Sequence, residues 1–173
     1  MKRLLLLRHF KSLPGEVGQR DRDRPLSQRG WRDARTMAAV LADHPPAPDL
    51  ILCSSARRTR ESLSAILPHI DGDTTVRIAD AIYETDEATY IPLIAAHGGT
   101  ANVVLLVGHN PTVHATAVTL AGSGPEHLRA DLAAKYPTGA LAILEFRGGS
   151  WDDLAPGTGT IAAAVSPRAA AAP

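Results

Sequence analysis

The sequence predicts a single α/β domain in three layers, with a mostly parallel β-sheet flanked by helices. Short apolar runs typical of buried strands alternate with longer segments that have the periodicity of amphipathic helices. This alternation indicates a parallel sheet, because parallel neighbours need a crossover helix between them. The 173 residues are enough for one domain with its own core. We expect that domain to cover residues 1–167, and residues 168–173, mostly alanine, to form a disordered tail.

Five apolar runs are predicted to form the strands of this sheet. They cover residues 4–7, 50–53, 103–107, 141–146 and 161–165. The last two runs follow one another without a helix, and a loop with several glycines and a proline joins them. Part of the sheet is therefore expected to be antiparallel.

Five segments between or after these runs carry helix signals. The first follows Ser27, a good N-cap residue, and is expected to end before Pro45, because proline cannot continue a helix. Glycines close the third helix, and Pro111 suits the first turn of the fourth. The remaining helices are predicted at residues 58–67, 87–96, 111–120 and 126–135.

Composition excludes several classes of protein. Lys+Arg and Asp+Glu both number 18, and this zero net charge argues against a nucleic-acid partner held by bulk electrostatics. The single cysteine, Cys53, allows no intrachain disulfide, which suits a reducing compartment. No run of about 18 apolar residues predicts a membrane span, and the N-terminal run is too short for a signal peptide. We therefore expect a cytoplasmic protein.

Two predicted strands are followed by a histidine. Arg8 and His9 come after the first apolar run, and His109 comes after the third. In a parallel α/β sheet, ligands bind outside the carboxyl ends of the strands, so both histidines are expected at the binding edge. A neutral imidazole is a nucleophile, and a neighbouring cation stabilises the negative charge of phosphoryl transfer. The pattern favours a site that holds an anion and attacks it.

Two more arginines are candidates for the same site. Arg24 precedes Pro25, which holds it extended, and it lies just before a helix start that itself favours anions. Arg58 lies in the first turn of the second helix, where the helix dipole favours acids, so an arginine there indicates a bound anion. Its neighbours Arg57 and Arg60 are expected to face solvent.

The acid and cofactor candidates are few. Glu84 is the best candidate for a general acid, although a surface acid or a helix cap explains it equally well. The chain has no P-loop, no dinucleotide fingerprint after the first strand, no His-Glu-x-x-His and no Gly-x-Ser-x-Gly. We therefore expect no nucleotide cofactor and no metal site.

Together these motifs resemble the histidine phosphatase superfamily, which has the phosphoglycerate mutase-like fold. Arg-His alone is weak evidence, whereas five ordered blocks over nearly the whole chain are strong evidence. The blocks are also similar to the SixA-type branch of phosphohistidine phosphatases. They are residues 6–12 (LLRHFKS), 24–27 (RPLS), 53–62 (CSSARRTRES), 107–111 (VGHNP) and 136–140 (YPTGA).

The resemblance implies a role for each candidate. His9 would be the nucleophile that becomes phosphorylated, and Arg8, Arg58 and His109 would form the phosphate pocket. Arg24 would be a further phosphate ligand of this branch. Hydrolysis would then run through a phosphohistidine, and no metal is needed because the arginines and histidines supply the charge.

Three features depart from the family pattern. Phe10 stands where the family usually has Gly or Ala, so its ring either narrows the pocket or points into the core. Ser62 stands where Thr is more common. The SixA-type branch also lacks a clear equivalent of the glutamate acid that the larger branches use, and the resemblance does not secure Glu84 in that role.

The expected function is hydrolysis of a phosphoryl group, with phosphohistidine on a protein as the leading substrate. The chain has little sequence to spare for a lid, and an open site suits a protein surface such as a histidine-phosphotransfer domain. A small-molecule phosphomonoesterase is one alternative, and a phosphate-binding module in which Phe10 blocks attack is another. The sequence predicts no oligomeric state.

Overall fold

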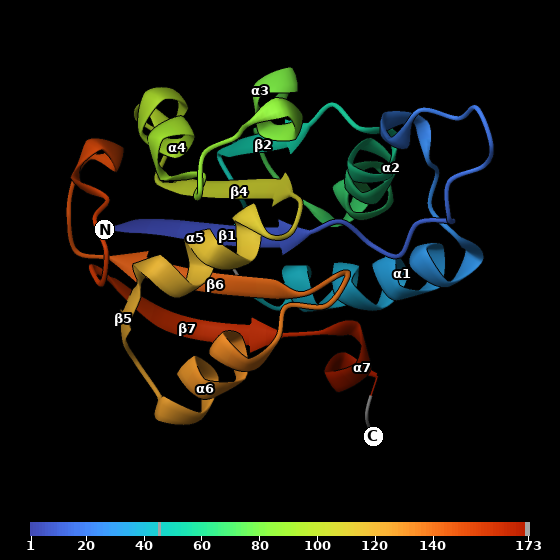
Figure 1. Cartoon of the computed structure of the whole chain (residues 1–173). Helices are drawn as coiled ribbons and strands as arrows, with labels where there is room; N and C mark the ends of the chain where they lie inside the picture. The colour runs from blue at the N-terminus through green and yellow to red at the C-terminus, as the bar shows by residue number, and fades with distance from the viewer. Residues whose placement is uncertain (45, 172–173) are drawn as a thin grey trace.

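A seven-stranded sheet runs through the protein in the order β3-β2-β4-β1-β6-β7-β5 (Figure 1). This computed structural model describes residues 1–44 and 46–171. The strands are β1 (Lys2–Arg8), β2 (Leu50–Ser54), β3 (Thr75–Ala79), β4 (Val103–Gly108), β5 (Ala121–Ser123), β6 (Leu141–Phe146) and β7 (Gly159–Val165). β1 lies in the middle of the order and is buried on both faces, which is why its apolar run is continuous.

Helices fill the connections between the strands. The α-helices are α1 (Gln28–Ala42), α2 (Arg57–Ile66), α3 (Asp80–Glu84), α4 (Ile91–Gly98), α5 (Thr112–Leu120), α6 (Glu126–Ala134) and α7 (Pro167–Ala170). Short 3-10 turns form at η1 (Asp21–Asp23), η2 (Leu67–His69) and η3 (Trp151–Asp153). Across residues 1–44 and 46–171, every helix is too short or too polar to cross a membrane.

The helices form a layer on each face of the sheet, as the sequence predicted. Leu4 and Leu6 of β1 pack in a cluster with side chains of α3, α4, α5 and α6. Leu5 and Leu7 point the other way and pack in a second cluster with side chains of α1, α2 and α7. Figure 1 shows α5 crossing one face of β1. The alternation along β1 therefore divides the core into two halves.

The sheet is mostly parallel, and β6 is the exception. β1 pairs parallel with β4, and β2 pairs parallel with both β3 and β4. β6 runs antiparallel to both of its neighbours, β1 and β7. The helix-free connection between the last two apolar runs predicted this antiparallel pair. Because β1, β2 and β4 share one direction, their carboxyl ends meet at one edge of the sheet.

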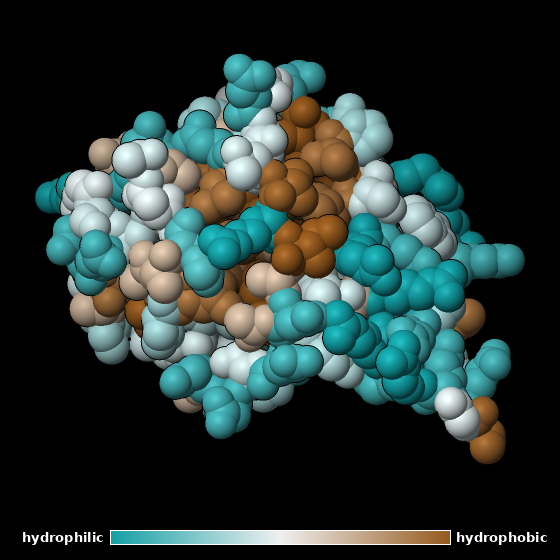
Figure 2. Space-filling view, turned by 90° about the horizontal axis from the view of Figure 1, so that it is seen from above, coloured by the Kyte–Doolittle hydropathy of each residue, from teal (hydrophilic) through white to brown (hydrophobic). Residues whose placement is uncertain are grey.

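The sequence analysis did not predict two strands, β3 and β5, because neither has the apolar run of a buried strand. β3 is an edge strand on which Val76 and Ile78 stay 40% and 52% exposed. Figure 2, which looks down from the β3 side of the sheet, shows a brown apolar area on this face. β5 has only three residues, Ala-Gly-Ser, and small residues carry little strand signal.

Two helical predictions need correction. The helix expected at residues 87–96 is instead α4, which begins at Ile91, with Pro92 in its first turn. The Tyr90 N–H donates to the Thr116 hydroxyl at 2.7 Å, so α5 fixes the point where the chain enters α4. The tail was expected to be disordered from residue 168, but residues 168–170 continue α7, capped by Ser166 and packed against α1. Residues 172–173 lie outside the described residues.

Candidate active site

The carboxyl ends of three neighbouring strands bring the candidate residues together. β4 lies between β1 and β2 in the sheet. Arg8 ends β1 and pairs with Gly108, the last residue of β4, so the residues that follow each strand lie side by side. His9 and His109 are those residues, and their ring centroids are 5.2 Å apart. Ser54 ends β2 on the other side of β4.

His9 is a buried, neutral histidine with a defined tautomer. The residue is 8% exposed, and Nδ1 donates a hydrogen bond to the Phe10 carbonyl oxygen at 2.7 Å. Because a carbonyl only accepts, the proton sits on Nδ1 and Nε2 carries the lone pair. Burial is the main cause that lowers the pKa of His9 to about 4, and the charges of Arg58 and Arg8 add to it. The ring is therefore neutral and its Nε2 is nucleophilic at neutral pH.

Phe10 points into the core and does not narrow the site. Its ring is fully buried in the cluster under α1 and α2. Its main-chain N–H donates to the Ser62 hydroxyl at 3.0 Å, and that hydroxyl donates to the Arg58 carbonyl at 2.6 Å. The Ser62 hydroxyl thus links the His9 segment to the first turns of α2. This link requires only a hydroxyl group, which serine and threonine both have.

Arg8 faces the segment that precedes β6. Its Nη1 donates to the Tyr136 carbonyl oxygen at 2.8 Å. Its Nε is buried without a hydrogen-bond partner in the described part of the chain. Burial lowers the pKa of Arg8 from its usual value, because the charged form is desolvated. An unsatisfied guanidinium donor beside a neutral histidine suits an incoming anion.

Asp21 joins two of the candidate arginines. Arg58 donates to it twice, from Nη1 to the carbonyl oxygen at 2.8 Å and from Nη2 to Oδ2 at 3.0 Å. Arg24 donates from Nη1 to Oδ1 at 2.8 Å, and the Tyr83 hydroxyl donates to Oδ2 at 3.1 Å. The hydrogen bond from Arg24 is the main cause that lowers the pKa of Asp21 to about 2, helped by Arg58 and Tyr83. The carboxylate stays ionised and holds the guanidinium groups in place.

Arg24 is the most fully engaged of the candidate arginines. Besides Asp21, it donates from Nε to the Leu13 carbonyl oxygen at 3.0 Å and from Nη2 to the Ser12 hydroxyl at 2.9 Å. Its backbone is extended, as the following proline predicted. Arg24 therefore fastens the loop between β1 and α1 and adds positive charge near His9.

The His109 ring is held at its Nε2 atom. Its Nε2 lies 2.7 Å from the Ser54 hydroxyl oxygen, and its Nδ1 is buried without a hydrogen-bond partner among the described residues. Tyr83 meets the ring edge-on at a centroid distance of 5.7 Å. Burial, followed by the charges of His9 and Arg58, lowers the pKa of His109 to about 3. His109 is therefore also neutral at neutral pH.

The ligand that these groups suit is an anion with several oxygens. Arg8 Nε and His109 Nδ1 are buried nitrogen atoms without hydrogen-bond partners among the described residues. Such atoms are rare in folded proteins and often mark a ligand site. Within the described residues, no three His, Cys, Asp or Glu side chains are arranged to hold a metal ion. Guanidinium groups around a neutral imidazole are suited to binding and attacking a phosphoryl group.

Comparison with known proteins decides the family. Residues 4–91, just over half of the chain, match the family model described as the histidine phosphatase superfamily (branch 1). The chain belongs to the histidine phosphatase superfamily. An uncharacterised protein of Mycobacterium tuberculosis is 36% identical over 164 residues, which cover 94% of this chain and 100% of that protein.

Two solved structures place this histidine phosphatase in the SixA-type branch. A proposed phosphohistidine phosphatase SixA from Nakamurella multipartitia has a TM-score of 0.81 and 32% identity, with 96% of each chain covered. Another proposed SixA from Agrobacterium tumefaciens has a TM-score of 0.80 and 33% identity, with 95% of this chain and 97% of that chain covered. These similarities show the phosphoglycerate mutase-like fold and support a phosphatase activity on a phosphorylated substrate.

Glu84 does not join the site of this histidine phosphatase. It lies at the end of α3, is exposed, and its side chain makes no hydrogen bond or ion pair with any described residue. It lines an outer groove with Pro92 and His97. Its neighbour Tyr83 faces the site instead, against Asp21 and His109. Arg57 and Arg60 are exposed, as the sequence predicted.

The sequence alone missed Asp21 and Tyr83, and it offered Ser54 only as a hydroxyl donor between strand and helix, without its contact with His109. Asp21 lies in the alternating run of arginines and aspartates at residues 20–24, which resembles an ordinary solvated surface. Tyr83 reaches the site only because α3 follows β3, the strand without a burial signal. Ser54 ends an apolar run, and a serine at a strand end is a common and uninformative feature.

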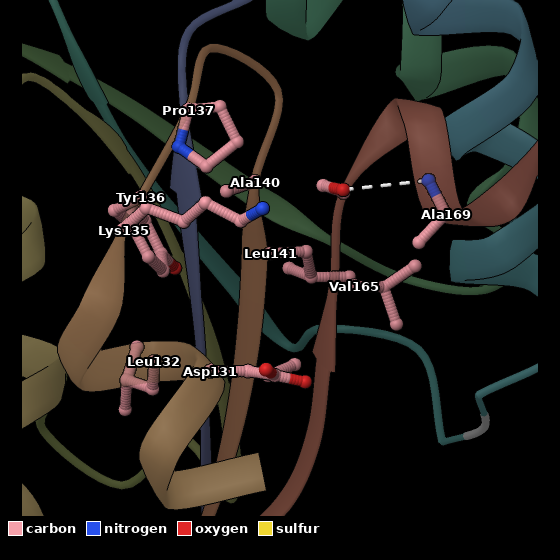
Figure 3. Close-up of a pocket in the computed structure, with 11 residues that line it drawn as sticks. Asp131, Leu132, Lys135, Tyr136, Pro137, Ala140, Leu141, Val165 and Ala169 are labelled. Atoms are coloured by element: carbon pink, nitrogen blue, oxygen red, sulfur yellow. Dashed lines mark hydrogen bonds between the residues drawn. The ribbon is translucent and has the colours of Figure 1, made fainter. Parts of the chain in front are cut away.

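A separate cavity of about 170 Å³ lies beside the site (Figure 3). Leu141 of β6 and Val165 of β7 lie side by side on its wall, and the Lys135 side chain extends toward β6. The cavity shares Tyr136 with the neighbourhood of Arg8, because the Tyr136 carbonyl accepts from that arginine. None of the candidate catalytic residues lines the cavity, so it is not the phosphoryl pocket.

Proposed function

We propose that this protein is a phosphohistidine phosphatase that acts on a phosphorylated protein through a phosphohistidine on His9. The state of His9 carries the proposal. Its Nδ1 is tied to the Phe10 carbonyl, so Nε2 presents a lone pair, and burial keeps the ring neutral. The two SixA structures above 30% identity are named for the same activity, which supports this choice of substrate.

In the first step, Nε2 of His9 attacks the phosphorus atom of the bound phosphohistidine. A new nitrogen–phosphorus bond forms while the bond to the substrate imidazole breaks, and the bonding electron pair leaves with the substrate nitrogen. Arg8 and Arg58 bind the phosphoryl oxygens and stabilise their charge during the transfer. Arg24 adds positive charge while it holds Asp21 beside Arg58.

In the second step, water attacks the phosphorus atom on His9. The bond to Nε2 breaks, its electron pair returns to the imidazole, and inorganic phosphate leaves. His9 regains its starting tautomer because Nδ1 kept its proton on the Phe10 carbonyl throughout. The chain's own side chains supply the charge for both steps.

Neither of two carboxyl groups among the described residues, Glu84 and Asp21, is suited to act as the acid, and this fits a phosphoramidate substrate. Glu84 is exposed and lines an outer groove with Pro92 and His97. Asp21, with a pKa of about 2, is ionised and cannot donate a proton near neutral pH. The leaving imidazole of a phosphohistidine is basic and takes a proton readily, whereas an alkoxide leaving group needs a positioned acid. A histidine-phosphotransfer domain in the cytoplasm is a substrate of this kind.

The experiment that tests the proposal measures phosphate release from two substrates. A phosphorylated histidine-phosphotransfer domain and p-nitrophenyl phosphate are each incubated with the wild-type protein and with His9→Ala, with and without EDTA. We expect release from the phosphoprotein that EDTA leaves unchanged and that His9→Ala abolishes. Acid-labile label trapped on the wild-type protein should mark the intermediate.

The other outcomes identify the alternatives. A strong preference for the small ester would point to a general phosphomonoesterase. No release from either substrate by a folded protein would point to a phosphate-binding module. Nothing about Phe10 favours the module, because its ring lies in the core, away from the attacking nitrogen.

A further inference from the structure

Ser54 is placed by the sheet to contact His109. Cys53 of β2 pairs with Val107 of β4, so the next residue of β2 lies level with the end of β4, where His109 follows. The Ser54 side chain is 0% exposed, and its hydroxyl oxygen lies 2.7 Å from His109 Nε2. The contact is therefore dry and joins the ends of two adjacent strands.

The hydrogen bonds of Ser54 decide which atom donates in this contact. The Ser54 oxygen accepts from the Ala56 N–H at 3.4 Å, and its own hydrogen has a single acceptor among the described residues, His109 Nε2. If Nε2 carried the proton instead, the hydroxyl hydrogen would be buried without an acceptor, which costs about 1–3 kcal/mol. Ser54 therefore donates to Nε2, and neutral His109 carries its proton on Nδ1.

We propose that Ser54 is a positioning residue that fixes His109 in the Nδ1–H tautomer, so that Nδ1–H donates to an oxygen of the transferring phosphoryl group. This role rests on the proposed phosphatase function. The two histidines then present opposite groups to the substrate: His9 offers a lone pair on Nε2, and His109 offers a proton donor on Nδ1.

The unpartnered Nδ1 of His109 supports this role. A buried N–H without an acceptor is costly, and a phosphoryl oxygen supplies the missing acceptor. Burial, helped by the charges of His9, Arg58 and Arg8, disfavours a second proton on the ring. A neutral donor also makes no ion pair with the product, so it adds less to the binding of inorganic phosphate than a third cation would.

Nitrogen NMR of the ¹⁵N-histidine-labelled protein tests the tautomer directly. In the wild type we expect His109 Nδ1 to be protonated and Nε2 to be unprotonated at pH 7. Inorganic phosphate, used as the probe, should shift the Nδ1 resonance more than the Nε2 resonance. A protonated Nε2 in the wild type overturns the proposal, and this measurement needs no phosphohistidine substrate.

Ser54→Ala, with Ser55→Ala as the matched control, links the tautomer to the reaction. The Ser55 hydroxyl faces Asp80 and Arg22, outside the contact with His109. We expect Ser54→Ala to give a mixture of His109 tautomers and a roughly 10-fold lower kcat on p-nitrophenyl phosphate. A loss of this size is typical when the hydrogen-bond partner that orients a metal-binding histidine is removed. Ser55→Ala should keep the His109 tautomer and the kcat of the wild type.

The outcomes separate this inference from the proposed function. Unchanged kcat together with an unchanged tautomer in a folded Ser54→Ala variant overturns the role of Ser54. An inactive wild type with the expected tautomer overturns the proposed function but not the tautomer. If Ser54→Ala does not fold, the wild-type spectrum and its phosphate titration decide the question.

Discussion

The neighbours of each buried histidine decide which ring atom it presents. A main-chain carbonyl holds Nδ1 of His9, whereas a serine hydroxyl holds Nε2 of His109. Both rings are neutral because burial disfavours their charged forms and the nearby guanidinium groups add repulsion. Two residues of one type thus differ in chemistry through the backbone and side chains that surround them.

The low pKa of His9 predicts that activity stays constant as the pH falls well below neutral. Attack needs the neutral ring, and a pKa of about 4 keeps it neutral well below the usual histidine value of about 6.5. The rate of His9 phosphorylation should therefore stay constant from about pH 7 to about pH 5 and fall as the pH passes through 4. Rapid-quench measurements check this.

The same profile should appear with p-nitrophenyl phosphate and with the phosphoprotein, because the titrating group belongs to the protein. An acid limb centred near pH 6.5 with both substrates would mean that His9 is not held neutral by its surroundings.

Arg58 and Arg57 are adjacent and should behave differently. Arg58 is 7% exposed and reaches Asp21 beside the histidines, whereas Arg57 is exposed and pairs with Glu61. Arg58→Ala should lower kcat/KM on the order of 10²-fold or more, as removal of a preorganised charge does. Arg57→Ala should stay near wild type. Steady-state kinetics on both variants measure the difference.

Circular dichroism melts should accompany those kinetics, because Arg58→Ala also leaves Asp21 with fewer partners. A loss in Arg57→Ala with full activity in Arg58→Ala would reverse the assignment of the two arginines.

At the scale of elements, the site depends on how β2, β4 and β1 end. The three strands are parallel neighbours, and their registers align Ser54, His109 and His9 across one edge. α2 then begins at Arg57, shortly after β2 ends at Ser54, and carries Arg58 in its first turn. The turn η1 supplies Asp21, so a loop that is far along the chain from α2 completes the charge arrangement.

Gly108 lets β4 end close to Tyr90, the residue before α4, so a substitution at this position should lower the stability of the protein. A Cβ atom at position 108 would lie 2.8 Å from a ring carbon of Tyr90, which is fully buried. Gly108→Ala should lower the free energy of unfolding by about 1–3 kcal/mol through overpacking. Because His109 is the next residue, activity should fall as well.

Urea unfolding monitored by fluorescence measures this change. Gly149→Ala is the control, because a Cβ there meets nothing within 4 Å. Equal stability of the two variants would show that Tyr90 moves aside at little cost.

At the scale of the whole molecule, the two faces of the sheet carry the core, and the candidate site lies at the carboxyl ends of β1, β2 and β4. Each face packs against its own layer of helices, and the polar cluster occupies the edge that neither layer covers. Folding desolvates the imidazoles of His9 and His109, and the stability of the protein depends on their protonation.

Stability should fall as the pH drops from about 6.5 toward 4. The folded pKa values of His9 and His109 are about 4 and about 3, and both lie below the unfolded value of about 6.5. In this window the unfolded chain binds more protons than the folded chain, so acid favours unfolding. Below about pH 4, protonation of Asp21 adds a further loss in the same direction.

Urea midpoints across this pH range check the prediction. The double variant His9→Asn with His109→Asn should lose less stability between pH 6.5 and 4 than the wild type. Parallel curves for the two proteins would show that other groups dominate the acid response.

Local chemistry was enough to predict most of the architecture and the centre of the site. Alternating apolar runs and amphipathic segments predicted the three-layer fold, because burial on both faces leaves a continuous apolar run in a central strand such as β1. The ordered motifs around His9, Arg58 and His109 indicated the family, which the comparisons confirmed.

The sequence by itself determined the fold class and the family. It also indicated His9, His109 and Arg58 as the centre of the candidate site. Only the tertiary structure decided that Phe10 turns into the core, that Glu84 stays outside the site, and that residues 168–170 form a helix. The reason is physical. Apolar periodicity and motif order are written locally, whereas the partners of Asp21 and Ser54 arise from strand register and loop packing between residues far apart in the chain.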